Sequence, residues 1–351
     1  MFKQFYCAEC KKATRLKAIV GLLVAAVLLC VVYLAVVGVV RSVASDEIEG
    51  QLPADFAVVR FSPETNRIGL ENAREMLEEA LRQKEEQGYS YYIGTNDPVY
   101  AAKSMVALYE YAVEHDLSGS YTVYMGNETL LMMIAPLSYP ATVAGLLSVL
   151  MLFPMIYAVI VGVRSFASEF RDRTIKLVLL RPVRRETLAL TKLLAVLTHA
   201  AAAFAATLLL ALIAGAIPAT TTSVADTIYV FNASDAFVAS DAFVLCPAIL
   251  FGLLSVLVVA AVSYAFGLLL RKVSSAMLLS LLLVFDVTGI VLQLTGLSRF
   301  SFGTALSLSY FFGAGITVPQ ANFFLSAAIL ILWGVGLPLA AILLFRKRDV
   351  A

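Results

Sequence analysis

Charged residues are scarce in this chain. Of its 351 residues, 15% are charged, against about 25% in a typical soluble domain, while 60% are hydrophobic and the mean hydropathy is +0.86. A chain this apolar cannot be water-soluble throughout, which excludes a cytosolic enzyme, a secreted disulfide scaffold and a disordered protein. The net charge of +1 gives no reason to expect nucleic acid or an acidic substrate as a partner.

Cysteine and histidine are also few. No two of the four cysteines fall together in a polar stretch, so no disulfide framework is expected. Cys7 and Cys10 form a lone CxxC, and because no further ligands lie nearby we expect no metal or redox site there. The histidines are His115 and His199, and the chain contains no HExxH, GxSxG or GxxxxGK[ST] motif. We therefore expect no catalytic, metal or cofactor site in this chain.

Long apolar runs are what the sequence does contain. A membrane-spanning helix needs about 20 predominantly apolar residues. Six stretches meet this requirement: 18–40, 141–163 (interrupted by Pro154), 193–217, 243–270, 274–297 and 323–345. The first is too long for a signal peptide and offers no clear cleavage site. The sequence therefore predicts an all-α polytopic membrane protein with six transmembrane helices.

Lysine and arginine predict the orientation of these spans. Of the 26 basic residues, 18 lie in segments that fall on one side of the six predicted spans, namely 1–17, 164–192, 271–273 and 346–351. The short loops on the other side, 218–242 and 298–322, contain only Arg299. Because basic loops stay in the cytoplasm, both termini are predicted to be cytoplasmic.

Residues 41–140 differ from the rest of the chain, because they contain no span-length apolar run and carry 7 basic and 16 acidic residues. Leu70–Gln87 has the pattern of an amphipathic helix. Asp97–His115 predicts a second helix, with Asp97 as N-cap and Pro98 in the first turn. Residues 57–61, 89–93 and 121–125 have the composition of strands. We predict a small α+β extracytoplasmic domain between the first two spans.

Two features interrupt the simple pattern of spans. Residues 304–316 are apolar, but this stretch is too short to cross a membrane and suits a re-entrant or interfacial helix. Asp286 lies near the middle of the span 274–297, where an acid costs about 2.5–3.5 kcal/mol on insertion scales. It is either a proton-sensitive residue of a transport pathway or a hydrogen-bonded link to a neighbouring helix, and we favour the link. His199 is expected to be a hydrogen-bonded polar residue of the bundle.

The segment 164–192 combines charge with an apolar pattern. A helix here cannot span a membrane, so its apolar face needs a membrane surface or another protein. A loop lying on anionic lipid would explain the basic residues but not the acids at 169, 172 and 186. A helix that docks onto a cytosolic partner explains both. In such a helix Glu169 and Arg173 can pair one turn apart, and Phe170, Thr174 and Leu177 share the adjoining face.

The same segment resembles the loop of ABC-2 type ABC transporter permeases. That loop has an acidic residue, a threonine, an apolar run, a proline near basic residues and a lysine that opens the next helix. The matching residues here are Glu169, Thr174, Pro182, Arg185 and Lys192, while Arg173 replaces the usual glycine. The closing FRKRDV at 345–350, the six spans and the large first outer loop are also similar, so the resemblance covers nearly the whole chain.

The resemblance implies a type V exporter-like fold and a permease subunit without an ATPase site. Two permeases, as a homodimer or a heterodimer, would form the pathway in the cell membrane, here of a prokaryote. Two cytosolic ATPase subunits would bind ATP and Mg²⁺, and residues 1–17 would form an elbow helix on the lipid bilayer. The residues implied to couple the ATPase to the spans are Glu169, Phe170, Arg173, Thr174, Leu177, Pro182 and Arg185.

Two other classes of function remain as alternatives. The chain could be a membrane sensor or assembly factor whose outer domain binds a ligand or partner. An intramembrane enzyme is disfavoured by the missing motifs. The resemblance does not indicate the transported substrate.

Overall fold

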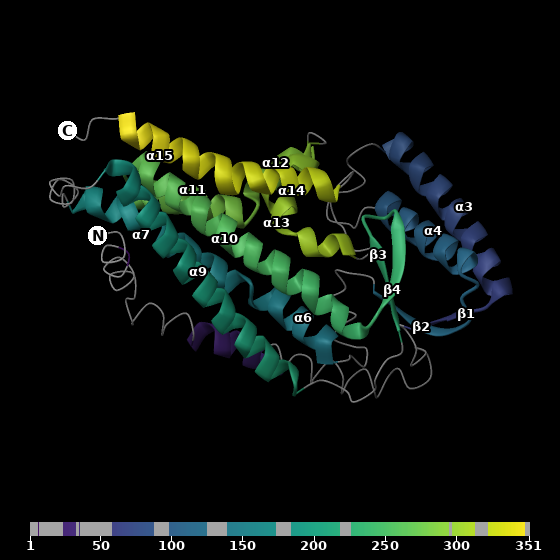
Figure 1. Cartoon of the computed structure of the whole chain (residues 1–351). Helices are drawn as coiled ribbons and strands as arrows, with labels where there is room; N and C mark the ends of the chain where they lie inside the picture. Colours follow the sequence, from purple (N-terminus) through teal and green to yellow (C-terminus); the bar gives the residue numbers. More distant parts are fainter. Residues whose placement is uncertain are drawn as a thin grey trace.

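The computed structural model describes most of the chain, in the ranges 24–32, 58–87, 98–124, 139–172, 184–217, 226–294, 297–312 and 322–347, together with Tyr6 and Ala35. The first predicted span, 18–40, is described only at 24–32 and 35, where it is helical. Cys7 and Cys10 lie outside the described residues. The protein is mostly helical, and its strands form one small sheet at one end (Figure 1).

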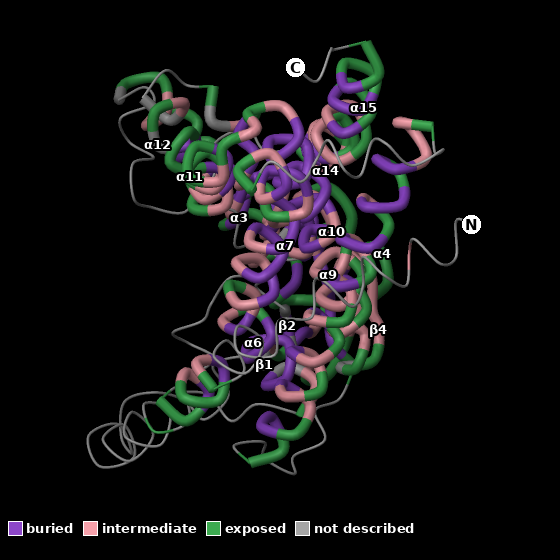
Figure 2. The backbone as a smooth tube through the Cα atoms, turned by 90° about the vertical axis from the view of Figure 1, so that its left-hand side faces the viewer, coloured by how far each residue is buried: buried purple, intermediate pink, exposed green. Residues whose placement is uncertain are grey.

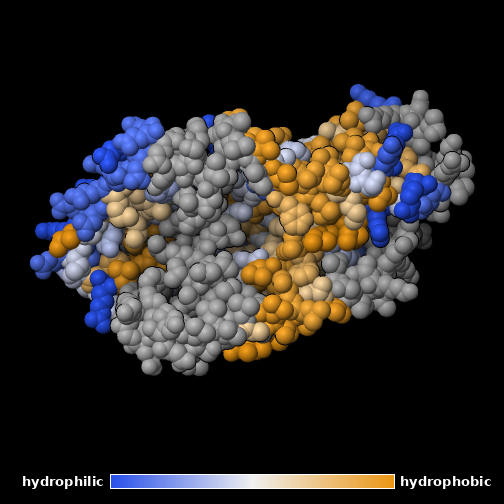
Figure 3. All heavy atoms as spheres, turned by 180° about the vertical axis from the view of Figure 1, so that it is seen from behind, coloured by the Kyte–Doolittle hydropathy of each residue, from blue (hydrophilic) through white to orange (hydrophobic). Residues whose placement is uncertain are grey.

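Four helices in the described part of the chain are long and apolar enough to cross a membrane. They cover Thr142–Arg171, Arg185–Gly215, Ala242–Leu270 and Phe323–Lys347. They correspond to the second, third, fourth and sixth predicted spans. Apolar side chains gather over the bundle and hydrophilic ones at its two ends (Figure 3). The prediction of a mostly helical chain with apolar helices of membrane-spanning length is thus confirmed for four of the six spans, and the count of six stays a prediction.

The second span consists of two helices, α6 (Tyr139–Leu150) and α7 (Leu152–Arg171). They meet at Met151, three residues before Pro154. Proline has no N–H to donate and its ring crowds the carbonyl four residues earlier, so an interruption at this point has a local cause. Because α7 continues to Arg171, the first eight residues of the predicted loop 164–192 belong to the helix.

Helix α10 (Leu245–Leu270) forms the centre of the bundle and packs against α7, α9 (Arg185–Gly215), α11 (Val273–Val284) and α15 (Leu337–Lys347). Glycines let α7 and α10 approach closely. A Cβ at Gly267 would lie 2.6 Å from the Val163 carbonyl oxygen, and one at Gly162 would lie 2.9 Å from the Ala260 carbonyl oxygen. Small residues at a helix contact allow this tight packing.

The α+β domain contains β1 (Val58–Phe61), α3 (Pro63–Gln87), α4 (Pro98–Glu114) and β2 (Gly119–Tyr124). The second predicted helix and two of the predicted strands are confirmed. The third strand, 89–93, lies outside the described residues. Helix α3 begins seven residues earlier than expected, because Ser62 accepts a hydrogen bond from the Thr65 backbone and caps a helix that starts with proline.

A hairpin completes the sheet, and it lies within 218–242, a segment that the sequence predicts as a loop. Strands β3 (Thr227–Phe231) and β4 (Asp235–Ala239) are antiparallel, and β3 pairs with β2 in parallel, giving the order β1-β2-β3-β4. Asn232 and Ala233 at the turn both have positive φ, 52° and 54°, as a tight hairpin turn requires. The domain is therefore not built from residues 41–140 alone.

The two faces of the sheet have different neighbours. One face packs against α4 through a cluster around Phe61, Leu108 and Ile228. Tyr229 on the other face packs with Ala144 of α6 and Val244 at the start of the fourth span. The sheet therefore joins the α+β domain to the bundle.

The fifth predicted span is not one continuous helix. Helix α11 ends at Val284, and α12 (Val287–Leu294) begins after a turn at Asp286, whose φ is 49°. The chain then passes through η3 (Ser298–Phe300), α13 (Phe302–Leu306) and η4 (Leu308–Phe312). Figure 2 shows α12 at the edge of the bundle. The helix expected over 274–297 is interrupted at Asp286, because its carboxylate binds backbone groups that a continuous helix would not present to it. That this segment crosses the membrane stays a prediction.

Short helical pieces do occupy the region predicted as a re-entrant or interfacial helix. Residues 302–312 form α13 and η4, and 313–321 lie outside the described residues. The last span consists of α14 (Phe323–Ile331), a π-helical turn at Leu332–Gly336 and α15. Helix α15 ends at the end of the bundle opposite the sheet (Figure 1).

Candidate functional site

In the described part of the bundle, two regions hold an acidic side chain that is shielded from water, fully at Glu169 and partly at Asp286. The first lies at the end opposite the sheet, where α7 ends, α9 begins and α15 ends, which we call the charged end. Glu169 of α7 and Lys192 of α9 form an ion pair there, with 2.8 Å between Lys192 Nζ and Glu169 Oε1. The side chains are 2% and 0% exposed, so the pair is shielded from water.

Lys192 makes further contacts to α7. Its Nζ donates a hydrogen bond of 3.0 Å to the Ser165 carbonyl and lies 5.0 Å from the centre of the Phe166 ring. Removing one partner of a buried ion pair usually costs about 3–5 kcal/mol, because it leaves a charge without compensation. The pair therefore holds together the two helices that flank residues 173–183.

Other contacts join the neighbouring helices at this end. The Tyr264 hydroxyl of α10 donates to the Ala189 carbonyl of α9 at 2.7 Å. The Phe166 ring lies 5.7 Å from that of Tyr264 and 5.3 Å from that of Phe345 on α15. Four helices thus meet in one packed unit at the charged end.

The surface of this end carries weaker contacts. Arg346 of α15 pairs with Glu186 of α9 at 2.9 Å, and both side chains are exposed. The Arg271 guanidinium lies 5.1 Å from the centre of the Phe170 ring. Exposed ion pairs contribute about 0–1 kcal/mol, so the buried pair dominates the energetics.

These positions correct one expectation. Glu169 was expected on the surface of a loop helix, paired with Arg173 next to the docking face. It is instead buried against Lys192, because α7 extends to Arg171 and turns this side chain toward α9. Phe170 is half-buried and packs against the core, and Arg185 is the first residue of α9. The remaining predicted coupling residues, Arg173, Thr174, Leu177 and Pro182, lie outside the described residues.

The second acid is Asp286, which is half-buried at the break between α11 and α12. Its Oδ1 accepts hydrogen bonds from the Gly289 and Gly303 backbone N–H groups, at 3.1 and 3.2 Å. Its Oδ2 accepts from the Ser301 hydroxyl at 2.9 Å. Three donors thus surround one carboxylate, and Ser301 is the kind of hydroxyl partner that the favoured interpretation expected.

Glycine is required at two of these donors. A Cβ at Gly289 or at Gly303 would overlap the Asp286 carboxylate. Ser301 and Gly303 lie 15 and 17 residues after Asp286, so the chain leaves this point along α12 and returns to it. The carboxylate therefore determines where α12 begins and where α13 packs.

His199, the other predicted intramembrane polar residue, is far less connected. It is buried, and its Nδ1 lies 2.7 Å from the carbonyl oxygen of Ala195 in the same helix. This contact agrees with the expected hydrogen-bonded residue of the bundle. Phe166 and Tyr264, by contrast, could not be recognised as site residues from the sequence, because aromatic residues in apolar runs give no distinguishing signal.

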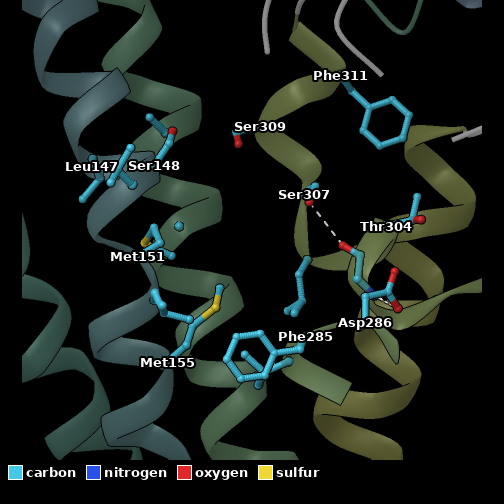
Figure 4. A pocket seen from close by; sticks show the side chains of 17 residues that line it. Leu147, Ser148, Met151, Met155, Phe285, Asp286, Thr304, Ser307, Ser309 and Phe311 are labelled. Atoms are coloured by element: carbon cyan, nitrogen blue, oxygen red, sulfur yellow. Dashed lines mark hydrogen bonds between the residues drawn. The ribbon is translucent and has the colours of Figure 1, made fainter. Parts of the chain in front are cut away.

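A cleft of about 510 Å³ lies beside Asp286. One wall comes from α6 and α7, with Leu147, Met151 and Met155, and α10 contributes Gly252. The facing wall comes from the α11–α12 break and from α13 and η4 (Figure 4). The break in the fifth span therefore forms part of the wall of a cavity of ligand size.

Comparison with known proteins identifies a family without an assigned function. No curated protein matches the chain. A family model described as "Protein of unknown function (DUF2705)" matches residues 123–351, which include the ion pair, the Asp286 site and the cleft. Because this match spans well over half of its residues, the chain belongs to the DUF2705 family.

Proposed function

We propose that this chain is the permease subunit of an ATP-binding-cassette exporter in a cell membrane. The observation that carries the proposal is the buried Glu169–Lys192 pair, which joins α7 and α9 on either side of residues 173–183. That loop combines apolar and charged residues in a way that suits a groove on a cytosolic protein. A loop that receives force from a partner needs a firm base, and the pair supplies one.

The mechanism follows from the contacts at the charged end. In this proposal two cytosolic ATPase subunits bind ATP and Mg²⁺, and each receives a loop of one permease. A displacement of the loop moves α7 and α9 together, because separating them would break the buried pair. Phe166 passes the movement to α10 through Tyr264 and to α15 through Phe345.

The same helix connects the charged end to the cleft. Helix α7 contains Glu169 near one end and Met155 on the cleft wall near the other. Movement of α7 against α11 and α13 would therefore change the width of the cleft. In the proposed exporter this is how ATP hydrolysis on the partner reaches the substrate, with a second permease, identical or different, completing the pathway.

A membrane sensor or assembly factor is the second candidate, favoured by how the α+β domain meets the bundle. The Asn232 N–H at the hairpin turn donates to the Phe311 carbonyl at 2.8 Å, and the Asn232 side-chain oxygen accepts from the Phe323 N–H at 3.1 Å. Binding of a ligand or partner to the domain could reach η4 and α14 through these bonds.

Identifying what purifies with the chain in mild detergent separates the two candidates. The exporter proposal expects an ATPase that contains a phosphate-binding loop. Leu177→Glu should remove most of that ATPase, because central contacts of an interface commonly contribute about 2 kcal/mol or more. Lys347→Glu, at the exposed end of α15, is the matched control and should retain the ATPase.

Two results would contradict the exporter. One is a native chain that purifies without any ATPase. The other is a Leu177→Glu chain that retains as much ATPase as the control. A receptor-type partner bound to the α+β domain, in place of the ATPase, would favour the second candidate.

A further inference from the structure

We propose that the cleft beside Asp286 binds an uncharged amphiphile, a molecule with one apolar body and a head that carries hydroxyl or amide N–H donors. This inference rests on the proposed function, for which it names the class of substrate. Apolar and polar side chains lie in different parts of the cleft, and Asp286, the acid among its described lining residues, already accepts three hydrogen bonds.

The cleft has an apolar part. Met151 and Met155 come from the α6–α7 wall and Phe285 from the facing wall (Figure 4). Methionine side chains are flexible and polarisable, so they adapt to apolar groups of different shape. Val284 and Leu152 extend this lining. An acyl chain or a ring system can be buried here without leaving polar atoms unsatisfied.

Hydroxyl groups gather in the other part. Ser148 of the α6 wall and Ser307 and Ser309 of the facing wall lie there (Figure 4). The Ser148 hydroxyl donates to the Ala144 carbonyl at 3.0 Å, and the Ser307 hydroxyl donates to the Gly303 carbonyl at 3.2 Å. A serine that has donated its proton retains acceptor capacity, so these two oxygens suit a ligand head that donates hydrogen bonds.

Asp286 does not convert the cleft into a cation site. Its carboxylate already accepts three hydrogen bonds, and it points toward α13 rather than toward Met151 and Met155 (Figure 4). A cationic head would lose its water in the apolar cleft without gaining a direct ion pair, which is costly. The described residues that line the cleft include no lysine or arginine to bind an anionic head either.

The volume agrees with this class of ligand. The cleft measures about 510 Å³, and sites for drug-sized molecules usually measure about 300–1,000 Å³. The sequence of hydroxyls and then apolar side chains along the cleft fixes the orientation of the ligand, with its head near Ser148 and Ser309 and its apolar body beside Met155 and Phe285.

Three 12-carbon amphiphiles that differ in the head test the proposal. Radiolabelled monolauroylglycerol is bound to the purified permease in nanodiscs, and binding to empty nanodiscs is subtracted. Unlabelled monolauroylglycerol should displace it at least tenfold more effectively than dodecyltrimethylammonium or laurate. Equal or better displacement by the cationic compound would overturn the proposal.

Variants locate the binding. Ser307→Ala removes one acceptor and should weaken binding about two- to tenfold, the range expected for one hydrogen bond. Met155→Trp should fill the apolar part and abolish binding, while Leu278→Trp, an exposed residue on α11 outside the cleft lining, should leave it unchanged. Full binding by both cleft variants would place the ligand elsewhere and overturn the proposal.

The assay contains no ATPase, so it separates this inference from the proposed function. Binding with the expected selectivity, in a chain that purifies without an ATPase, would support the cleft and contradict the exporter. If an ATPase purifies with the chain but monolauroylglycerol is not bound selectively, the exporter is supported and the cleft proposal is contradicted. A second copy of the chain could instead cover the cleft. Ser307→Cys would then react with maleimide in the monomer but not in the dimer, and that result would also overturn the binding proposal.

Discussion

The charged end and the Asp286 region each hold one carboxylate in an apolar bundle, and they stabilise it in opposite ways. Glu169 is almost completely buried and Asp286 is half-buried. Glu169 is compensated by a cation, Lys192, from a neighbouring helix, so α7 and α9 stay regular on either side of the pair. Asp286 is compensated by backbone N–H groups and a hydroxyl, which a regular helix does not offer. The ion pair joins two continuous helices, whereas the hydrogen bonds to Asp286 require a break in the helix.

Because the two carboxylates are compensated differently, the two regions differ in their mechanical properties. An ion pair between continuous helices resists their separation and suits the transmission of force. A broken helix held by three hydrogen bonds creates a corner, and in this protein the corner forms the wall of a cleft. The comparison leads to predictions about what each carboxylate tolerates.

The largest effect is expected for Glu169→Lys. It would place two cations at a site that is almost completely buried, so we expect a loss of about 3–5 kcal/mol and little monodisperse protein. Glu186→Lys is the matched control, because Glu186 forms an exposed pair and should change stability by about 1 kcal/mol or less. Purification yield and the midpoint of thermal unfolding measure both.

A charge swap sharpens this test. Combining Glu169→Lys with Lys192→Glu restores a pair of opposite charges and should recover much of the lost stability. Equal stability of Glu169→Lys and Glu186→Lys would show that the buried pair does not hold the two helices together.

Replacing each carboxylate by an amide compares the two sites directly. Glu169→Gln leaves Lys192 as a buried cation without its counter-charge, so we expect a loss of about 3–5 kcal/mol. Asp286→Asn keeps an oxygen for the two glycine N–H groups, and its amide N–H can donate to the Ser301 hydroxyl, so about 1 kcal/mol is expected. We therefore expect a lower unfolding midpoint for Glu169→Gln than for Asp286→Asn. A lower midpoint for Asp286→Asn would contradict the distinction between the two sites.

A smaller effect is expected for Gly303→Ala. The new methyl group would overlap the Asp286 carboxylate and displace α13, at a cost of about 1–3 kcal/mol. Gly336→Ala is the control, because its nearest neighbour would be the Leu332 side chain at 3.4 Å, an ordinary contact. Adding Asp286→Ala to Gly303→Ala should cost less than the sum of the single changes, and strict additivity would argue against the contact.

Much of the fold could be predicted because its signals are local. The apolar runs identify four spans that the structure contains, and Pro98 marks the start of α4. The hairpin Thr227–Ala239 has a visible signal in its β-branched and aromatic residues. Its short strands, however, pair with β2, whose paired residues lie 105 positions earlier in the chain. Short strands of this kind depend on pairing that composition does not reveal.

The site could be predicted only in part, for a similar reason. Lys192 stands out in the sequence as a lysine expected to open a helix, but α9 already begins at Arg185, within the predicted loop 164–192. The pairing of Lys192 with Glu169 depends on how α7 and α9 are rotated relative to each other. Asp286 was recognised as an unusual acid within a span. The break at that residue depends on Ser301 and Gly303 returning to it, which no pattern within 274–297 indicates.

The central claim is that the charged end faces the cytosol, where an ATPase can reach it. Its most direct test is maleimide labelling of Arg173→Cys in intact cells, in a chain whose four native cysteines have been replaced. Glu114→Cys at the end of α4 serves as the control for the opposite side. We expect Glu114→Cys to be labelled from outside and Arg173→Cys only after permeabilisation. Labelling of Arg173→Cys from outside would contradict the account, because no cytosolic ATPase could then bind the loop.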